Sequence, residues 1–197
     1  MTIAPTKFVH VVYRTRRFDE MIGWHMTVFG ARVQYQDPGL AFLTYDDEHH
    51  RFAFINMALL DPTGGGPDDR GPIGVDHVAY TYASLSDLFG QHAELKGKGI
   101  TPYWCIHHGI TVSMYFGDPD GTQMEFQVDC FADNDDANAF MYRSFAVNPI
   151  GVEYDPDVWL ADLRSGTPAT ELLTRTTDLP VSPVRSATSD GFALPAR

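Results

Sequence analysis

Basic residues are scarce in this chain, which has 14 lysines and arginines against 26 aspartates and glutamates among its 197 residues, for a formal net charge of −12. Proteins that bind nucleic acid neutralise the phosphate backbone with clustered lysines and arginines. The charge balance therefore argues against nucleic acid as a partner.

Long apolar runs are missing as well. No segment approaches the roughly 18 consecutive apolar residues of a membrane-spanning helix. Residues 1–7 lack the hydrophobic region of a signal peptide. We therefore expect a protein that has no membrane partner and works in the cytoplasm.

Cysteine is nearly absent, since the chain has only Cys105 and Cys130. They lack the C-x-x-C spacing of metal sites, and nothing in the sequence indicates an oxidising compartment, so we expect buried free thiols. Hydrophobic residues, in contrast, make up 44% of the chain and aromatic residues 13%. This composition excludes a disordered chain and is enough for a sizeable core.

An internal repeat organises the sequence. The segments 9–13 (VHVVY) and 76–80 (DHVAY) each place a histidine in an apolar, β-type run. Hydrophobic periodicity and turn residues predict a strand, a helix and three further strands after each histidine. In the first copy these lie at 8–13, 18–29, 31–35, 40–45 and 51–59, and in the second at 77–82, 84–96, 100–106, 111–116 and 122–128.

The repeat predicts an α+β fold with two tandem βαβββ modules. Within residues 1–130 we expect a first module at 7–60, a linker loop rich in glycine and proline at 61–73, and a second module at 74–130. A C-terminal extension covers 131–197. It is expected to hold a short helix or strand at 137–145, a helix at 155–163, and an extended arm from 174 that packs on a neighbour or is mobile.

The two repeated histidines and one glutamate suggest a metal site. His10 and His77 lie in the first strand of each module, and Glu125 lies in the last strand of the second, after the turn at 117–121 (GDPDG). A single histidine at a strand start is most often structural, and it is the repetition that favours a metal site. Two imidazoles and one carboxylate leave coordination positions open and are the ligand set of non-haem Fe(II) oxygenases, and Mn(II) accepts the same set.

Over residues 7–130 this pattern resembles the vicinal oxygen chelate superfamily. The resemblance implies sheets that curl into a half-barrel around a metal held by His10, His77 and Glu125. Isomerases and lyases of that superfamily have a fourth ligand, a glutamate of the first module. Ala58 stands at that place when the repeats are superposed, although a slipped alignment could bring in Asp61. Three ligands favour an oxygenase.

Local segments resemble the type I extradiol catechol dioxygenases. The segment 48–54 (EHHRFAF) is similar to the one whose second histidine is the acid/base of that family, which implies this role for His50. Arg51 departs from the family's usual small hydroxyl residue. The polar character of the segment places His49 in an exposed turn.

Two further segments carry the same resemblance. Ser113-Met114-Tyr115 implies that Tyr115 binds a substrate oxygen, and the strand that ends before His107-His108 implies a histidine on the dioxygen side. We choose His107 over His108 for that role. The segment 148–152 (NPIGV) resembles a C-terminal segment of some single-domain relatives.

Taken with the resemblance, the sequence predicts an extradiol dioxygenase that inserts O2 into a catechol-type aromatic diol at a non-haem Fe(II), with Mn(II) as the other metal that fits. A monocyclic, a biaryl and a fused-ring diol all fit the expected apolar pocket. A homo-oligomer is expected, as for many enzymes. The alternatives are a metal-dependent isomerase, epimerase or lyase of the same superfamily, and a ligand-sequestering binding protein.

Overall fold

The computed structural model describes residues 2–63, 74–117 and 123–187. The chain forms two compact units. The first unit is Val9–Val78, and the second unit combines Met1–Phe8 with Ala79–Arg197. Most of the predicted linker and the turn at 118–121 lie outside the described residues, as does the end of the C-terminal arm.

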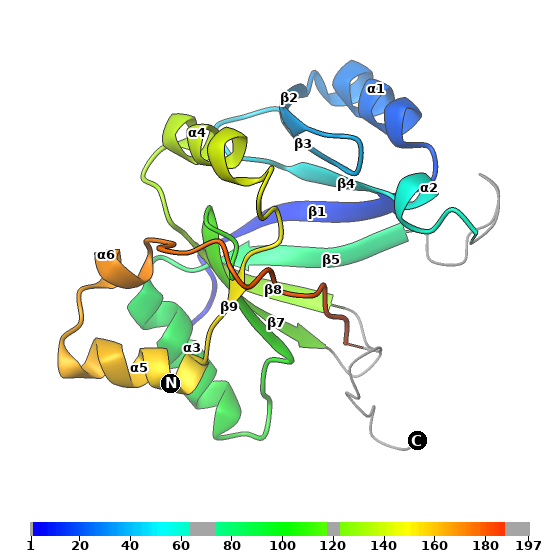
Figure 1. Ribbon diagram of the computed structural model, residues 1–197. Helices are drawn as coiled ribbons and strands as arrows, with labels where there is room; N and C mark the ends of the chain where they lie inside the picture. The colour runs from blue at the N-terminus through cyan, green and yellow to red at the C-terminus, as the bar shows by residue number, and fades with distance from the viewer. Residues whose placement is uncertain (1, 64–73, 118–122, 188–197) are drawn as a thin grey trace, which may run out of the picture. The chain divides into compact units, whose positions relative to one another are not determined.

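The first unit is a sheet with one long helix (Figure 1). Along the chain follow β1 (Lys7–Thr15), α1 (Phe18–Phe29), β2 (Arg32–Gln36), β3 (Leu40–Thr44), β4 (Phe52–Asn56), α2 (Met57–Leu60) and β5 (Gly74–Thr81). β3 pairs antiparallel with β2 and β4, and β1 pairs in parallel with β4. On its other side β1 neighbours β5. His10 on β1 and His77 on β5 therefore lie on neighbouring strands.

Helix α1 is attached to this sheet by its apolar stripe. Phe18 and Ile22, four residues apart, are buried against Leu43 and Phe54 of the sheet, as expected for residues one helical turn apart. The helix ends at Gly30, whose φ of 63° lies in the left-handed region that glycine adopts without strain.

The second unit has an antiparallel sheet covered by helices. Its elements are α3 (Leu85–Lys96), β6 (Trp104–His107), β7 (Thr111–Gly117), β8 (Gln123–Asp129), α4 (Asn134–Ser144), β9 (Val152–Glu153), α5 (Pro156–Ser165) and α6 (Ala169–Leu172). The strand order is β8-β7-β6-β9. The helices α4, α5 and α6 and the strand β9 belong to the C-terminal extension, which therefore lies within this unit in its described part.

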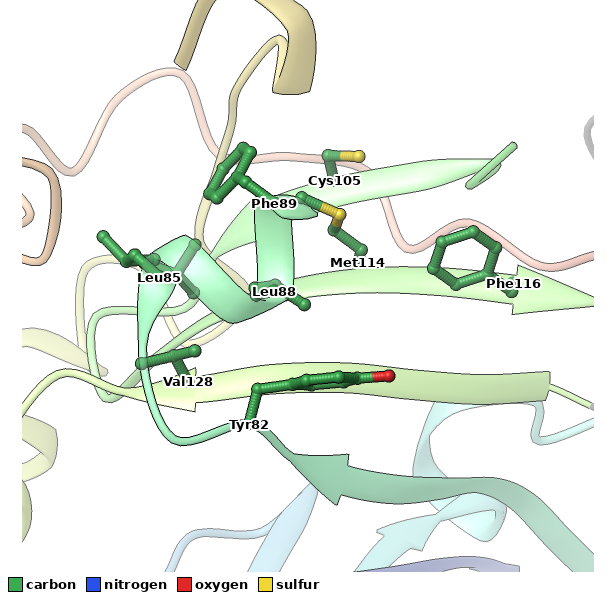
Figure 2. Packing of buried hydrophobic residues seen from close by; sticks show 9 residues of the cluster. Tyr82, Leu85, Leu88, Phe89, Cys105, Met114, Phe116 and Val128 are labelled. Carbon is green, nitrogen blue, oxygen red and sulfur yellow. The ribbon is translucent and has the colours of Figure 1, made fainter. Parts of the chain in front are cut away.

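The core of the second unit lies between α3 and the sheet. Side chains of Leu85, Leu88 and Phe89 from α3 lie over Cys105 and Met114 of the strands (Figure 2). Burying each large apolar side chain contributes about 1.5–3 kcal/mol. The side chain of Ser84 accepts a hydrogen bond from the backbone N–H of Asp87 and so caps the start of α3.

The α+β fold class predicted from the sequence is confirmed, and the order strand–helix–strand–strand–strand occurs twice along the chain. Several details differ from the prediction. The strand expected at 51–59 ends at Asn56 and continues as α2, the strand expected at 100–106 begins only at Trp104, and β9 and α6 were not foreseen. Among the described residues, every helix is too short or too polar to cross a bilayer.

Candidate functional site

Two of the predicted metal ligands face each other in the first unit. His10 on β1 is 3% exposed. The ring centroids of His10 and of His77 on β5 lie 5.7 Å apart, and the two ring planes meet at 75°. One ring nitrogen of each histidine lies within 4.8 Å of the other. Two imidazole nitrogens at this separation can bind one divalent cation.

A carboxylate fixes the orientation of His77. Its Nδ1 lies 2.7 Å from Oδ2 of Asp76, and Oδ1 of Asp76 forms an ion pair with Nε of Arg14 at 3.3 Å. Because Nδ1 donates its proton to the carboxylate, Nε2 keeps the lone pair that a metal needs. Neighbouring residues on a strand normally face opposite ways, so this contact could not be predicted from the sequence pattern.

His50 lies directly beside the histidine pair. Its ring stacks on His10 at 4.1 Å and on Phe42 at 4.2 Å, and it is 4% exposed. Its Nδ1 lies 2.6 Å from Nδ1 of His49. The expectation that His49 occupies an exposed turn is wrong, because its side chain is buried together with that of Glu48.

Arg51 explains why this polar segment is buried. Its guanidinium donates to the carbonyl oxygen of Val9 at 2.8 Å and to both carboxylate oxygens of Asp46, at 3.1 and 3.0 Å. Burial acts to raise the pKa of Asp46, but the hydrogen bonds from Arg51 and the Glu48 backbone outweigh it and hold the pKa below its usual range. Arg51 thus ties the loop to the strand that carries His10.

The candidate fourth ligand, Asp61, is engaged elsewhere in the first unit. Its Oδ2 accepts a hydrogen bond at 2.9 Å from Nη2 of Arg16, whose side chain is only 3% exposed. Ala58, the counterpart of Glu125 in the repeat, lies on α2. Both observations fit a site with three protein ligands.

The third predicted ligand lies in the second unit, within a cluster of its own. Glu125 on β8 is 2% exposed and pairs in register with Tyr115 on β7. Nε2 of His108 lies 3.0 Å from the Tyr115 hydroxyl and 3.9 Å from Oε1 of Glu125. In a neutral His108, whose Nδ1 donates to the carbonyl oxygen of Ile150, Nε2 accepts the proton of the Tyr115 hydroxyl.

His107, chosen from the sequence for the dioxygen side, lies outside this cluster. Its ring faces Trp159 at 6.1 Å, and its Nδ1 accepts a hydrogen bond of 3.0 Å from the backbone N–H of Gly109. Burial, helped by the positive charge of Arg175, lowers the pKa of His107 to about 4. His108, and not His107, contacts the Tyr115 hydroxyl, because adjacent residues of an extended segment face opposite ways.

The chain resembles known proteins over most of its length. A family model described as the Glyoxalase/Bleomycin resistance protein/Dioxygenase superfamily matches residues 7–126. Biphenyl-2,3-diol 1,2-dioxygenase 2 of Rhodococcus globerulus is 42% identical over 184 residues, which are 93% of this chain and 94% of that protein. Biphenyl-2,3-diol 1,2-dioxygenase 3 of the same organism is 37% identical over 178 residues, 89% of this chain and 90% of its own.

Solved structures share the fold over a smaller part. The Mn(II)-bound glyoxalase from Novosphingobium aromaticivorans has a TM-score of 0.53 and 26% identity, and the match covers 64% of this chain and 38% of that one. A substrate complex of homoprotocatechuate 2,3-dioxygenase from Brevibacterium fuscum has a TM-score of 0.51 and 16% identity, over 65% of this chain and 38% of that one. The chain thus spans well under half of these larger proteins.

Proposed function

Because the chain belongs to the glyoxalase/bleomycin resistance protein/dioxygenase superfamily, we propose that it is an extradiol dioxygenase, which opens the ring of an aromatic diol beside its two hydroxyls with O2. Two relatives that are 42% and 37% identical are biphenyl-2,3-diol 1,2-dioxygenases. They match it over about nine-tenths of its length. A biaryl diol is therefore the substrate we propose, ahead of a monocyclic or fused-ring diol.

The observation that carries this proposal is the stack of His50 on His10. It places a group that can exchange protons near neutral pH directly against a proposed metal ligand. Ring cleavage needs such a group, because a diol hydroxyl must lose its proton and a later intermediate must regain one. The Phe42 ring on the other face holds the imidazole in place.

We propose that His10, His77 and Glu125 hold the metal, which is Fe(II), with Mn(II) as the other ion that suits this donor set. The residues fit a metal, since two ring nitrogens converge and Asp76 leaves Nε2 of His77 with its lone pair. A bound ion would offer open coordination positions and would lower the pKa of a coordinated hydroxyl. Glu125 is assigned from its buried place on β8 and from the resemblance.

The other roles fall to residues that hold and orient the diol. His50 takes the proton of a substrate hydroxyl and returns it later. The Tyr115 oxygen, whose own proton is donated to His108, accepts a hydrogen bond from a substrate hydroxyl. We propose that His108 takes the role on the dioxygen side that was expected for His107.

We also propose that the enzyme is a homo-oligomer in the cytoplasm. Sedimentation tests the oligomeric state, and cell fractionation tests the location.

An oxygen electrode tests the activity. The purified protein, loaded with Fe(II) or with Mn(II), is given biphenyl-2,3-diol, catechol or a fused-ring diol. We expect oxygen uptake, fastest with the biaryl diol, and a yellow ring-opened product. No uptake with any diol and either ion would contradict the proposal and favour an isomerase, a lyase or a binding protein.

Variants separate the metal ligands from the acid/base. His10→Ala, His77→Ala and Glu125→Ala should each lose metal, measured as ions per chain. His50→Phe should keep the metal but lower turnover by about 10²–10⁴-fold. His25→Phe, in which another buried histidine of the first unit is replaced, is the control and should retain both. Full metal content in all three ligand variants would refute this assignment.

A further inference from the structure

A buried chain of three polar side chains leads to His50 in the first unit. Glu48, His49 and His50 are 4%, 3% and 4% exposed. Nδ1 of His49 lies 2.6 Å from Nδ1 of His50, and Nε2 of His49 lies 3.7 Å from Oε1 of Glu48. The sequence had left Glu48 and His49 without a role, and the proposed reaction does not use them.

The close approach of two Nδ1 atoms restricts where the protons lie. In a neutral pair of imidazoles, a hydrogen bond between two ring nitrogens requires that one carries a proton and the other a lone pair. The Glu48 carboxylate on the far side of His49 favours a proton on Nε2 of His49. Nδ1 of His49 is then the acceptor, and Nδ1 of His50 is the donor.

The ring stack alone leaves the orientation of His50 undecided. Packing between Phe42 and His10 fixes the plane of the ring. A half-turn about the ring's own bond would keep the same plane and exchange the two edges, because this torsion of histidine has a broad, roughly two-fold preference. A hydrogen-bond partner at Nδ1 removes that freedom.

We propose that His49, held by Glu48, is a positioning residue that keeps the proton of His50 on Nδ1, so that Nε2 of His50 is the basic atom offered to the substrate. The role of His49 in the reaction rests on the proposed function, whereas the tautomer of His50 does not depend on it. The loop is held in place by Arg51, which bonds to Val9 and Asp46 and lies 3.7 Å from Oε2 of Glu48.

Nitrogen NMR tests the tautomer directly. The full chain is labelled with 15N at its histidine rings and loaded with Zn(II), a diamagnetic ion. We expect Nδ1 of His50 to give the signal of a protonated ring nitrogen and Nε2 that of an unprotonated one. In His49→Phe both tautomers of His50 should appear. A wild-type His50 with its proton on Nε2, or an unchanged His50 in His49→Phe, would overturn the inference.

Kinetics provide the second readout. Loss of a group that orients a functional histidine typically costs about 10–100-fold, and we expect His49→Phe to lower kcat to that extent with little change in KM for the diol. His49→Asn keeps an acceptor oxygen and should recover part of the loss. His25→Phe is the matched control, because it also replaces a buried imidazole of the first unit.

The outcomes separate the two proposals. Equal losses in His49→Phe and His25→Phe would indicate general damage to the unit and would overturn the positioning role. If the wild-type protein opens no diol ring, the proposed function fails, while the NMR experiment still decides which nitrogen of His50 carries the proton.

Discussion

At the level of single residues, burial determines the charge of His107 in the second unit. Its pKa is lowered to about 4, chiefly by burial and then by the charges of Arg175 and His108. An unfolded chain has a histidine pKa near 6.5. Between about pH 4 and 6.5 the unfolded state therefore binds more protons than the folded state, and stability falls as the pH is lowered through this window.

His107→Gln should reduce this pH dependence. Each unit of pKa shift corresponds to about 1.4 kcal/mol, so His107 accounts for roughly 3 kcal/mol of the stability lost between pH 7 and pH 4. Glutamine does not titrate and can still accept the Gly109 hydrogen bond. Urea unfolding at pH 7, 6 and 5 measures the slope for both proteins. Equal slopes would show that His107 contributes nothing to the acid sensitivity.

Residues of the candidate site differ in how far the sequence could reveal them. His10, His77 and His50 could be picked out because a repeat and a local motif mark them. The burial of His49 could not, because it depends on Arg51 reaching back to Val9, 42 residues away. The choice between His107 and His108 depends on strand register, which a sequence pattern fixes only to within a residue or two.

At the level of elements, the segment before β9 positions the Tyr115 cluster. Asn148 is fully buried, and its side chain accepts from the backbone N–H of Ile150 and Gly151 and donates to the carbonyl oxygens of Gly151 and Asp178. The turn so formed aims the Ile150 carbonyl at His108. The motif at 148–152, which pointed only to a resemblance, thus has a structural role.

Asn148→Ala should destabilise the protein by about 2–4 kcal/mol, because several buried backbone groups lose their partner at about 1–3 kcal/mol each. A chain of this size then melts roughly 4–16 °C lower, at about 2–4 °C per kcal/mol. Asn138→Ala on α4 is the control, since its side-chain oxygen has no hydrogen-bond partner within the described residues. Calorimetry measures both, and an unchanged melting temperature in Asn148→Ala would contradict this role.

The longer elements were the most predictable and the short ones the least. The bounds of α1 match the prediction because its apolar stripe begins at Phe18 and Gly30 ends the helix. The run from 51 to 59 reads as one strand, yet the backbone turns into α2 after Asn56. Short apolar runs do not distinguish a strand from a helical turn, and the outcome depends on contacts elsewhere.

At the scale of the whole molecule, the C-terminal extension completes the core of the second unit. Helix α5 runs beside α3 (Figure 1). Tyr154 and Trp159 stack at 4.1 Å, and Trp159 also faces Phe89 of α3 at 6.4 Å. The described part of the arm, 174–187, also lies against this unit, where Ser182 accepts a hydrogen bond from the Trp104 ring. The extension is thus part of the folded unit.

Removing the central side chain of this contact should therefore destabilise the second unit. Replacing a buried tryptophan by alanine costs about 3–5 kcal/mol, and because Trp159 is only half-buried we expect Trp159→Ala to cost roughly 2–4 kcal/mol. Amides of α3 and β7, which pack in the same core, should lose protection from hydrogen exchange. Val158→Ala alters the adjacent residue, whose side chain is 54% exposed, and should change stability by less than about 0.5 kcal/mol. Equal unfolding curves for Trp159→Ala and the wild type would show that the extension only lies on the surface of the core and does not stabilise it.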